Sequence, residues 1–200
     1  MASDRWKHHP HPVPGVSWSS PCSSSPCTDV GALILATSAS KTLREHFEKE
    51  LSETLPSYTE FGYAVANRAR HVNDLLGLPT NALDATLLLA ISYHRQIHVY
   101  VYGDGYILTR DLEGHVTAVQ VSFARNMPYY LSYWLDKSRC EDYVAATDGG
   151  TGVLTIREIH EEREDVRQAD YDEALIFPFD IQTFSAIALA SDGVSSFMSV

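Results

Sequence analysis

The pattern of apolar and polar positions predicts two amphipathic helices in the first half of the chain. The first has Thr28 or Asp29 as N-cap and ends at Pro56, and its apolar positions are Leu33, Leu43, Phe47, Leu51 and Leu55. The second opens with a capping box at residues 57–60, and its apolar positions are Phe61, Val65, Ala69, Val72 and Leu76. Gly77 and Pro79 then end it. We expect the two helices to form one antiparallel layer.

The pattern after residue 80 indicates strands. Residues 83–93 are almost continuously apolar, which is typical of a central strand covered on both faces. Residues 97–102 and 106–111 are two further β runs, and the Gly-Asp-Gly between them predicts a tight hairpin with Asp104 at its tip. Residues 115–123, 152–159, 175–179 and 184–190 also predict strands. The expected fold class is therefore α+β, with two antiparallel sheets packed face to face and helices outside.

Three segments between these strands are less regular. Residues 126–140 are rich in aromatic side chains, which suits a lid, a substrate-facing loop or a packed crossover, and we favour the crossover. Asp148-Gly149 is interpreted as a hairpin turn. Residues 158–172 are mainly acidic and hold few apolar residues, so we expect a solvated loop or a short exposed helix.

Composition narrows the class of protein. The 200 residues suffice for one domain, which we place at residues 25–200, after a disordered Pro- and Ser-rich arm at residues 1–24. The net charge of −11 repels a phosphate backbone, so nucleic acid is not expected as a partner. No apolar run approaches the roughly 20 residues that span a bilayer, and the N-terminus lacks the apolar segment of a signal peptide. We expect a cytoplasmic protein without a membrane partner.

Two aspartates stand where an apolar β run meets a glycine. Asp104 lies between Gly103 and Gly105, and Asp192 precedes Gly193 after the run that ends at residue 190. Carboxylate and carbonyl oxygens are the ligands that Mg²⁺ and Mn²⁺ prefer, so a shared cation site is one interpretation. The alternative is that each Asp-Gly pair is an ordinary turn. The cation site requires the two carboxylates to lie together at one edge of the sheets.

Four motifs in order carry a family resemblance: Ser-Pro-Cys-Thr-Asp-Val-Gly-Ala at residues 25–32, Asp-Ala-Thr-Leu-Leu-Leu-Ala at 84–90, Gly-Asp-Gly at 103–105 and Leu-Ala-Ser-Asp-Gly-Val at 189–194. Together they resemble the metal-dependent protein phosphatases of the 2C type, in particular their compact bacterial branch. The resemblance runs from about residue 24 to the C-terminus. It implies an αββα four-layer sandwich.

The resemblance also implies a chemistry. In this family, paired Mn²⁺ or Mg²⁺ ions activate a water that hydrolyses phosphoserine and phosphothreonine, so no side chain acts as the nucleophile. Asp104 and Asp192 match the metal-ligand motifs, with Gly105 and Gly193 shaping the turns. Asp84 and Asp29 are further candidate carboxylates, although a strand-end turn residue is the simpler interpretation of Asp84. Phosphorylated proteins are the implied substrates, and a serine/threonine kinase is an implied partner.

The chain departs from the family pattern at both ends. The family has a strand ending in Asp-Gly directly before the first helix, and its aspartate bridges the two metals; residues 15–24 here read Gly-Val-Ser-Trp-Ser-Ser-Pro-Cys-Ser-Ser. A final acidic pair beyond the Asp192 motif has no counterpart either. We therefore expect a domain truncated at both ends relative to the family, with one weakly bound ion and little turnover. The alternative is a catalytically inactive 2C-like module that binds a partner.

Overall fold

The computed structural model describes residues 26–48, 54–160 and 163–192. Its helices are α1 (Pro26–Glu48), α2 (Tyr58–Leu75) and α3 (Lys137–Ala146), with short 3-10 helices at Thr80–Leu83, Ala124–Asn126 and Leu131–Leu135. Its strands are β1 (Leu87–Tyr93), β2 (Gln96–Tyr102), β3 (Gly105–Asp111), β4 (Val116–Phe123), β5 (Leu154–Ile159), β6 (Glu164–Ala169), β7 (Ile176–Asp180) and β8 (Phe184–Ala190). The arm predicted at residues 1–24 lies outside the described residues, as does Gly193.

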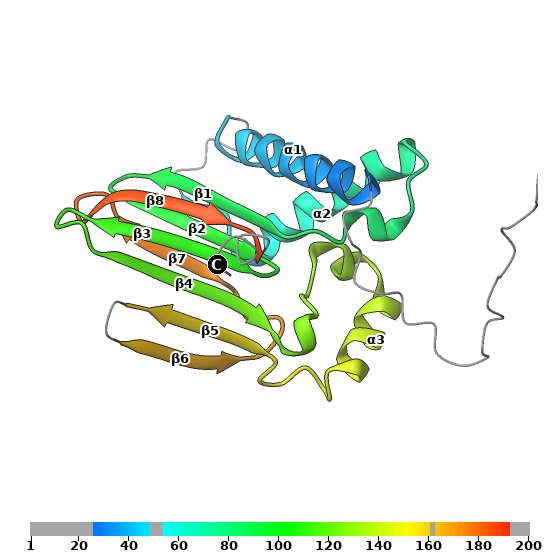
Figure 1. Cartoon of the computed structure of the whole chain (residues 1–200). Coiled ribbons are helices and arrows are strands. Elements are labelled where there is room, and N and C mark those ends of the chain that lie inside the picture. Colours follow the sequence, from blue (N-terminus) through cyan, green and yellow to red (C-terminus); the bar gives the residue numbers. More distant parts are fainter. Residues whose placement is uncertain (1–25, 49–53, 161–162, 193–200) are drawn as a thin grey trace, which may run out of the picture.

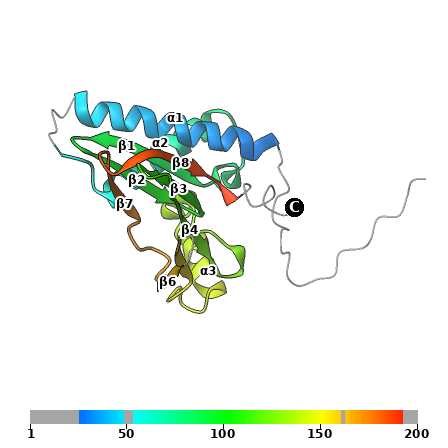
Figure 2. The same ribbon diagram turned by 60° about the vertical axis from the view of Figure 1, so that its left-hand side comes forward.

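The strands form two antiparallel sheets, in the orders β1-β2-β7 and β6-β5-β4-β3-β8 (Figure 1). Buried residues of both sheets, among them Val101, Ile107 and Leu154, belong to one core cluster. The α1 and α2 helices lie side by side on the β1–β2 side, and α3 lies beyond the ends of β4 and β5 (Figure 2). The predicted α+β fold with two antiparallel sheets and flanking helices is confirmed.

The α2 helix begins where the capping box predicted. The Ser57 hydroxyl oxygen accepts a hydrogen bond from the backbone N–H of Glu60, and the same hydroxyl donates to the Glu60 carboxylate at 2.7 Å. Phe61, Val65 and Ala69 are buried, so the predicted apolar face does point into the core. The α1 helix starts at Pro26, two or three residues before the predicted N-cap, and residues 49–53 at its far end lie outside the described residues.

Three buried tyrosines fix α2 to the sheet beneath it. Tyr58 donates its hydroxyl to the carbonyl of Val101, and Tyr102 donates to the carbonyl of Tyr58, both at 2.8 Å. Tyr100 donates in the same way to the carbonyl of Pro56. Burial raises the pKa of Tyr58 and Tyr102 above the ordinary range, so both stay protonated donors. These bonds position β2, whose last residue leads directly into the Gly-Asp-Gly segment.

The predicted hairpin at Asp104 is wrong. The β2 strand pairs with β1 and β7, whereas β3 pairs with β4 and β8, so residues 103–104 carry the chain from one sheet to the other. Gly103 and Gly105 have φ values of +100° and +145°, which an L side chain rarely adopts. A Cβ on Gly103 would come within 2.8 Å of the Thr86 hydroxyl, and one on Gly105 within 2.7 Å of the Ala190 carbonyl. The two glycines therefore let this crossing pass tightly between β1 and β8.

Several other predictions need correction. The strand predicted at residues 83–93 begins at Leu87, and β1 is an edge strand within the described sheet rather than a central one. Residues 158–172 form neither a loop nor a helix throughout, because Glu164–Ala169 pairs with β5 as the strand β6. Asp148-Gly149 is not a hairpin turn, since it connects α3 to β5. The favoured packed crossover at residues 126–140 does contain buried residues, Leu131 and Ser132.

Within the described ranges, no helix combines the length and the apolar character that crossing a bilayer requires.

Candidate metal centre

Asp104 is a buried carboxylate at the crossing between the sheets. Its side chain is only 6% exposed, and Oδ1 accepts a hydrogen bond from the Thr86 hydroxyl at 2.6 Å. Burial raises the pKa of Asp104 above its usual range; the Thr86 hydrogen bond opposes this shift and the charge of Asp192 adds to it. A carboxylate in this setting is costly to ionise unless a cation lies beside it.

Asp192 lies at the same edge of the sheet. The β8 strand ends at Ala190, which pairs with Tyr106 directly after Gly105. Asp192 follows two residues later, is exposed, and is close enough to raise the pKa of Asp104. The structure therefore brings together the two aspartates that the sequence placed in separate Asp-Gly motifs.

Tyr130 is a third group at this edge, and the sequence did not single it out. Burial raises its pKa above the ordinary range, and the charges of Asp104, Asp84 and Asp192 each contribute further. The phenol therefore stays protonated and offers a hydrogen-bond donor among acceptors. The aromatic-rich run at residues 126–140 was the signal, but its lack of periodicity gave no reason to choose Tyr130 over its neighbours.

Asp84 has a different role from Asp104. Its Oδ1 accepts a hydrogen bond from the Ser132 hydroxyl and its Oδ2 pairs with Arg139, both at 2.6 Å. The Arg139 guanidinium lies 4.3 Å from the centre of the Tyr133 ring. Asp84 thus fixes the segment after β4 to the entry of β1, two residues before Thr86.

Asp29 is exposed in the first turn of α1. Its charge is not among those that raise the pKa of Asp104 or of Tyr130. The described structure thus groups Asp104 with Asp192 and gives no such electrostatic link for Asp29.

Comparison with known proteins decides the family. The model of the family described as Protein phosphatase 2C matches residues 22–200. The chain belongs to the protein phosphatase 2C family. No curated protein matches the sequence, and no solved structure matches the fold. The predicted resemblance is confirmed, and the metal ligands of this 2C-type chain remain predictions.

Asp104, Asp192 and Tyr130 together form what we call the acidic edge. The residues of this edge fit the divalent cation on which the protein phosphatase 2C family depends. Asp104 and Asp192 supply carboxylate oxygens, the donor type that Mg²⁺ and Mn²⁺ prefer. The hydrogen bonds that lower the pKa of Asp104 come from Thr86 and from its own backbone, and no cationic side chain of the described residues contributes. A bound cation would supply the missing positive charge.

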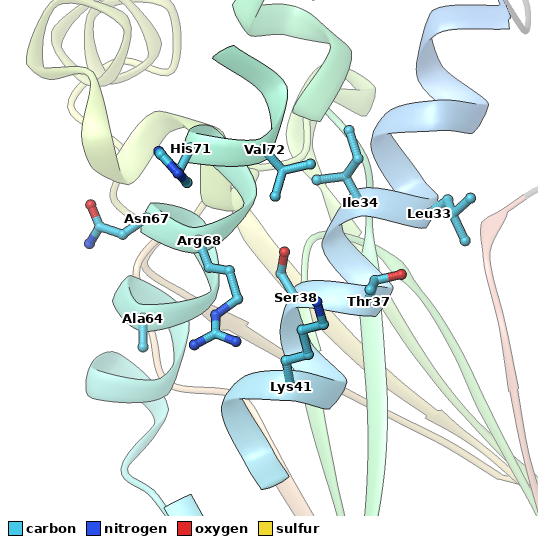
Figure 3. Close-up of a pocket in the computed structure, with 10 residues that line it drawn as sticks. All are labelled: Leu33, Ile34, Thr37, Ser38, Lys41, Ala64, Asn67, Arg68, His71 and Val72. Carbon is cyan, nitrogen blue, oxygen red and sulfur yellow. The ribbon is translucent and has the colours of Figure 1, made fainter. Parts of the chain in front are cut away.

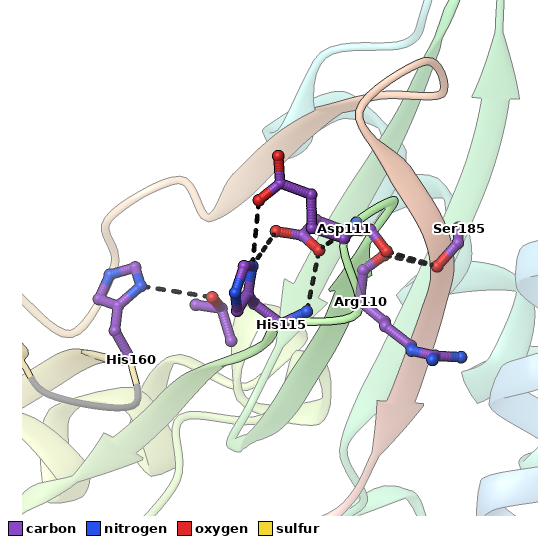
Figure 4. A network of polar contacts seen from close by, with 7 residues as sticks. Arg110, Asp111, His115, His160 and Ser185 are labelled. Carbon is purple, nitrogen blue, oxygen red and sulfur yellow. Dashed lines mark hydrogen bonds and ion pairs between the residues drawn. The ribbon is translucent and has the colours of Figure 1, made fainter.

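A second group of possible ligands lies at the other end of β3 in this 2C-type domain. Ligand atoms of Asp111, Glu113 and His115 all lie within 4.8 Å of one another (Figure 4). Desolvation acts to raise the pKa of Asp111, but the hydrogen bonds from His115 and from the backbone of the turn together outweigh it and lower the pKa. The turn itself therefore satisfies this carboxylate, which separates it from the poorly compensated Asp104.

The structural role of Asp84 yields a prediction. The Asp84→Asn change keeps an acceptor for Ser132 but removes the charge that faces Arg139, whose side chain is only 25% exposed. We expect unfolding free energy to fall by about 2 kcal/mol, since breaking a partly buried pair leaves one charge uncompensated. Urea denaturation measures this loss, and Mn²⁺ affinity should fall much less than in Asp104→Asn. Weakened Mn²⁺ binding with unchanged stability would instead make Asp84 a metal ligand.

Proposed function

We propose that the edge formed by Asp104, Asp192 and Tyr130 binds one divalent cation, Mn²⁺ or Mg²⁺, and acts on phosphoserine and phosphothreonine in proteins. The observation that carries this proposal is the buried Asp104 carboxylate, which shares its edge with Asp192 and, among the described residues, has hydrogen bonds as the contacts that lower its pKa. Membership of the protein phosphatase 2C family supports the choice of reaction.

The residues at this edge would have different roles in binding the cation and the phosphate. Thr86 holds one oxygen of Asp104 in place, which leaves the other for the cation. Asp192 contributes a carboxylate at the exposed side, where a substrate reaches the edge. Tyr130, which is protonated throughout the physiological range, donates a hydrogen bond to a phosphate oxygen. A divalent cation held by Asp104 and Asp192 would lower the pKa of a bound water and neutralise phosphate charge.

The net charge of the chain bears on how a phosphorylated substrate is recognised. A chain with a net charge of −11 repels a phosphorylated segment unless a local cation offsets the repulsion. Recognition of the phosphate therefore depends on the bound ion rather than on a basic surface. The proposed partner is the serine/threonine kinase that phosphorylates the same substrates.

Phosphate release from a phosphothreonine peptide tests this function. Because the described residues supply two clustered carboxylates rather than the full set of a bridged pair, we expect slow release by the 200-residue chain. That release should require Mn²⁺ or Mg²⁺ and disappear in Asp104→Asn, whereas Asp142→Asn, an exposed aspartate on α3, should behave as the wild type. Equal phosphate release by the wild type and Asp104→Asn would contradict a phosphatase function at this site. Rapid release by the wild type would contradict the proposal that the site binds one divalent cation.

A further inference from the structure

A cavity lies between α1 and α2, and none of its lining residues belongs to the edge formed by Asp104, Asp192 and Tyr130. This helix groove has a volume of about 700 Å³, and its lining residues are Leu33, Ile34, Thr37, Ser38, Lys41, Ala64, Asn67, Arg68, His71 and Val72. Figure 3 shows Ile34 and Ser38 on α1 facing Val72 and Arg68 on α2. The groove thus runs between the facing sides of α1 and α2, and small and apolar side chains are part of its lining.

Apolar surface remains exposed in the groove and beside it on α1. Leu33, which lines the groove, is 67% exposed, and Val30, one turn earlier on the same helix and outside the lining, is 40% exposed. Residues 33–41 and 64–72 each span about 12 Å along a helix at 1.5 Å per residue. That length equals about two helical turns, which suits the i, i+4 and i+7 side chains of a docked amphipathic helix.

The charged side chains that line the groove indicate the sign of the charge on a bound partner. The groove contains Lys41, Arg68 and His71 and no acidic residue, although the whole chain holds 26 acidic and 15 basic residues. Arg68 pairs with Glu45, whereas Lys41 and His71 form no ion pair among the described residues. Because Glu45 neutralises Arg68, the net positive charge of the lining comes from Lys41 and, when protonated, from His71. That charge favours an occupant with negative charge.

The two terminal stretches outside the described residues do not match that chemistry, and the internal stretches 49–53 and 161–162, although they hold glutamates, are shorter than two helical turns. Residues 1–25 hold one acidic and two basic side chains besides their histidines, and residues 193–200 hold no charged side chain. Neither stretch supplies the acidic groups that Lys41 and His71 would meet. A separate partner protein fits better.

We propose that the helix groove binds an acidic amphipathic helix of a partner protein. Its apolar side chains contact Ile34, Val72 and the exposed Leu33, and its carboxylates face Lys41 and His71. The site lies on the helix layer and is distinct from the acidic edge, so this inference does not depend on the proposed phosphatase function.

Fluorescence polarisation with two labelled peptides of about 14 residues tests this proposal. Both carry leucine at i, i+4, i+7 and i+11; one has glutamate at the flanking positions and the other has lysine. We expect the acidic peptide to bind the full chain with a Kd of about 10 to 100 µM, and the basic peptide to bind at least about tenfold more weakly. No binding of the acidic peptide, or equal binding of both, would overturn the proposal.

Four exposed variants locate the binding. Leu33→Glu and Lys41→Glu each add negative charge to the groove and should weaken the acidic peptide about tenfold or more. Leu112→Glu and Lys137→Glu make the same changes at sites outside the groove, where Leu112 is 72% exposed, and should leave affinity unchanged. All four positions are exposed, so folding should be preserved. The proposal of a separate acidic partner would be contradicted if Leu33→Glu and Lys41→Glu left the peptide affinity unchanged. It would also be contradicted if the chain formed a dimer that Leu33→Glu dissociates.

Discussion

Replacing Gly31 by alanine should lower the free energy of unfolding by about 3 kcal/mol. Gly31 lies in α1, and a Cβ at this position would overlap the backbone carbonyl oxygen of Ala82. No side-chain rotation relieves that overlap, so α1 must move away from residues 80–83. The preference of helices for alanine over glycine, about 1 kcal/mol, acts in the opposite direction and is too small to compensate.

The same substitution should also disturb the acidic edge. Ala82 lies four residues before Thr86, whose hydroxyl donates a hydrogen bond to the Asp104 carboxylate. We therefore expect Gly31→Ala to weaken Mn²⁺ binding as well as stability. Urea denaturation and Mn²⁺ titration measure the two effects, with the exposed α1 change Ser40→Ala as the control. Wild-type stability in Gly31→Ala would show that α1 does not pack against residue 82 in this way.

The Asp104→Asn change should alter stability in opposite directions with and without metal. Burial raises the pKa of Asp104, so the folded metal-free chain favours the neutral carboxyl, and stability falls as pH rises through that raised pKa. Asparagine removes this fall and keeps an acceptor for Thr86. In EDTA at neutral pH we expect the melting temperature to rise by about 2 to 4 °C, which is about 1 kcal/mol for a domain of this size.

Mn²⁺ should reverse the order of the two proteins. At 100 times the Kd, a ligand that binds only the folded state stabilises it by about 2.7 kcal/mol. The wild type should gain this amount and Asp104→Asn should gain almost none. Thermal melts in EDTA and in Mn²⁺ measure the reversal, with Asp142→Asn expected to follow the wild type. An equal Mn²⁺ gain in both proteins would place the ion away from Asp104.

Local patterns were sufficient to predict α1, α2 and most strands, whereas α3 was not predicted. The Ser57 capping box and the apolar face at Phe61, Val65 and Ala69 specify α2 without information from the rest of the chain. The Asp104 and Asp192 motifs were also visible, because each follows an apolar β run and adjoins a glycine. Their meeting at one edge depends on the pairing of β3 with β8, which the sequence indicated only through the order of its motifs.

Long-range pairing explains the errors. A Gly-Asp-Gly between two β runs is locally the same whether the runs pair with each other or enter different sheets. The β6 strand has five exposed residues out of six, so its side chains show no apolar alternation, and its backbone pairing with β5 makes it a strand. The Asp84–Arg139 pair joins residues 55 positions apart and has no local signature.

A direct Mn²⁺ titration, with free ion followed by electron paramagnetic resonance, tests the central claim that Asp104 and Asp192 hold a divalent cation. We predict one Mn²⁺ per wild-type chain, and affinity lower by about tenfold or more, or about 1.4 kcal/mol, in Asp104→Asn and in Asp192→Asn. The Asp142→Asn control should bind as the wild type does. Unchanged Mn²⁺ affinity in both Asp104→Asn and Asp192→Asn would contradict the account.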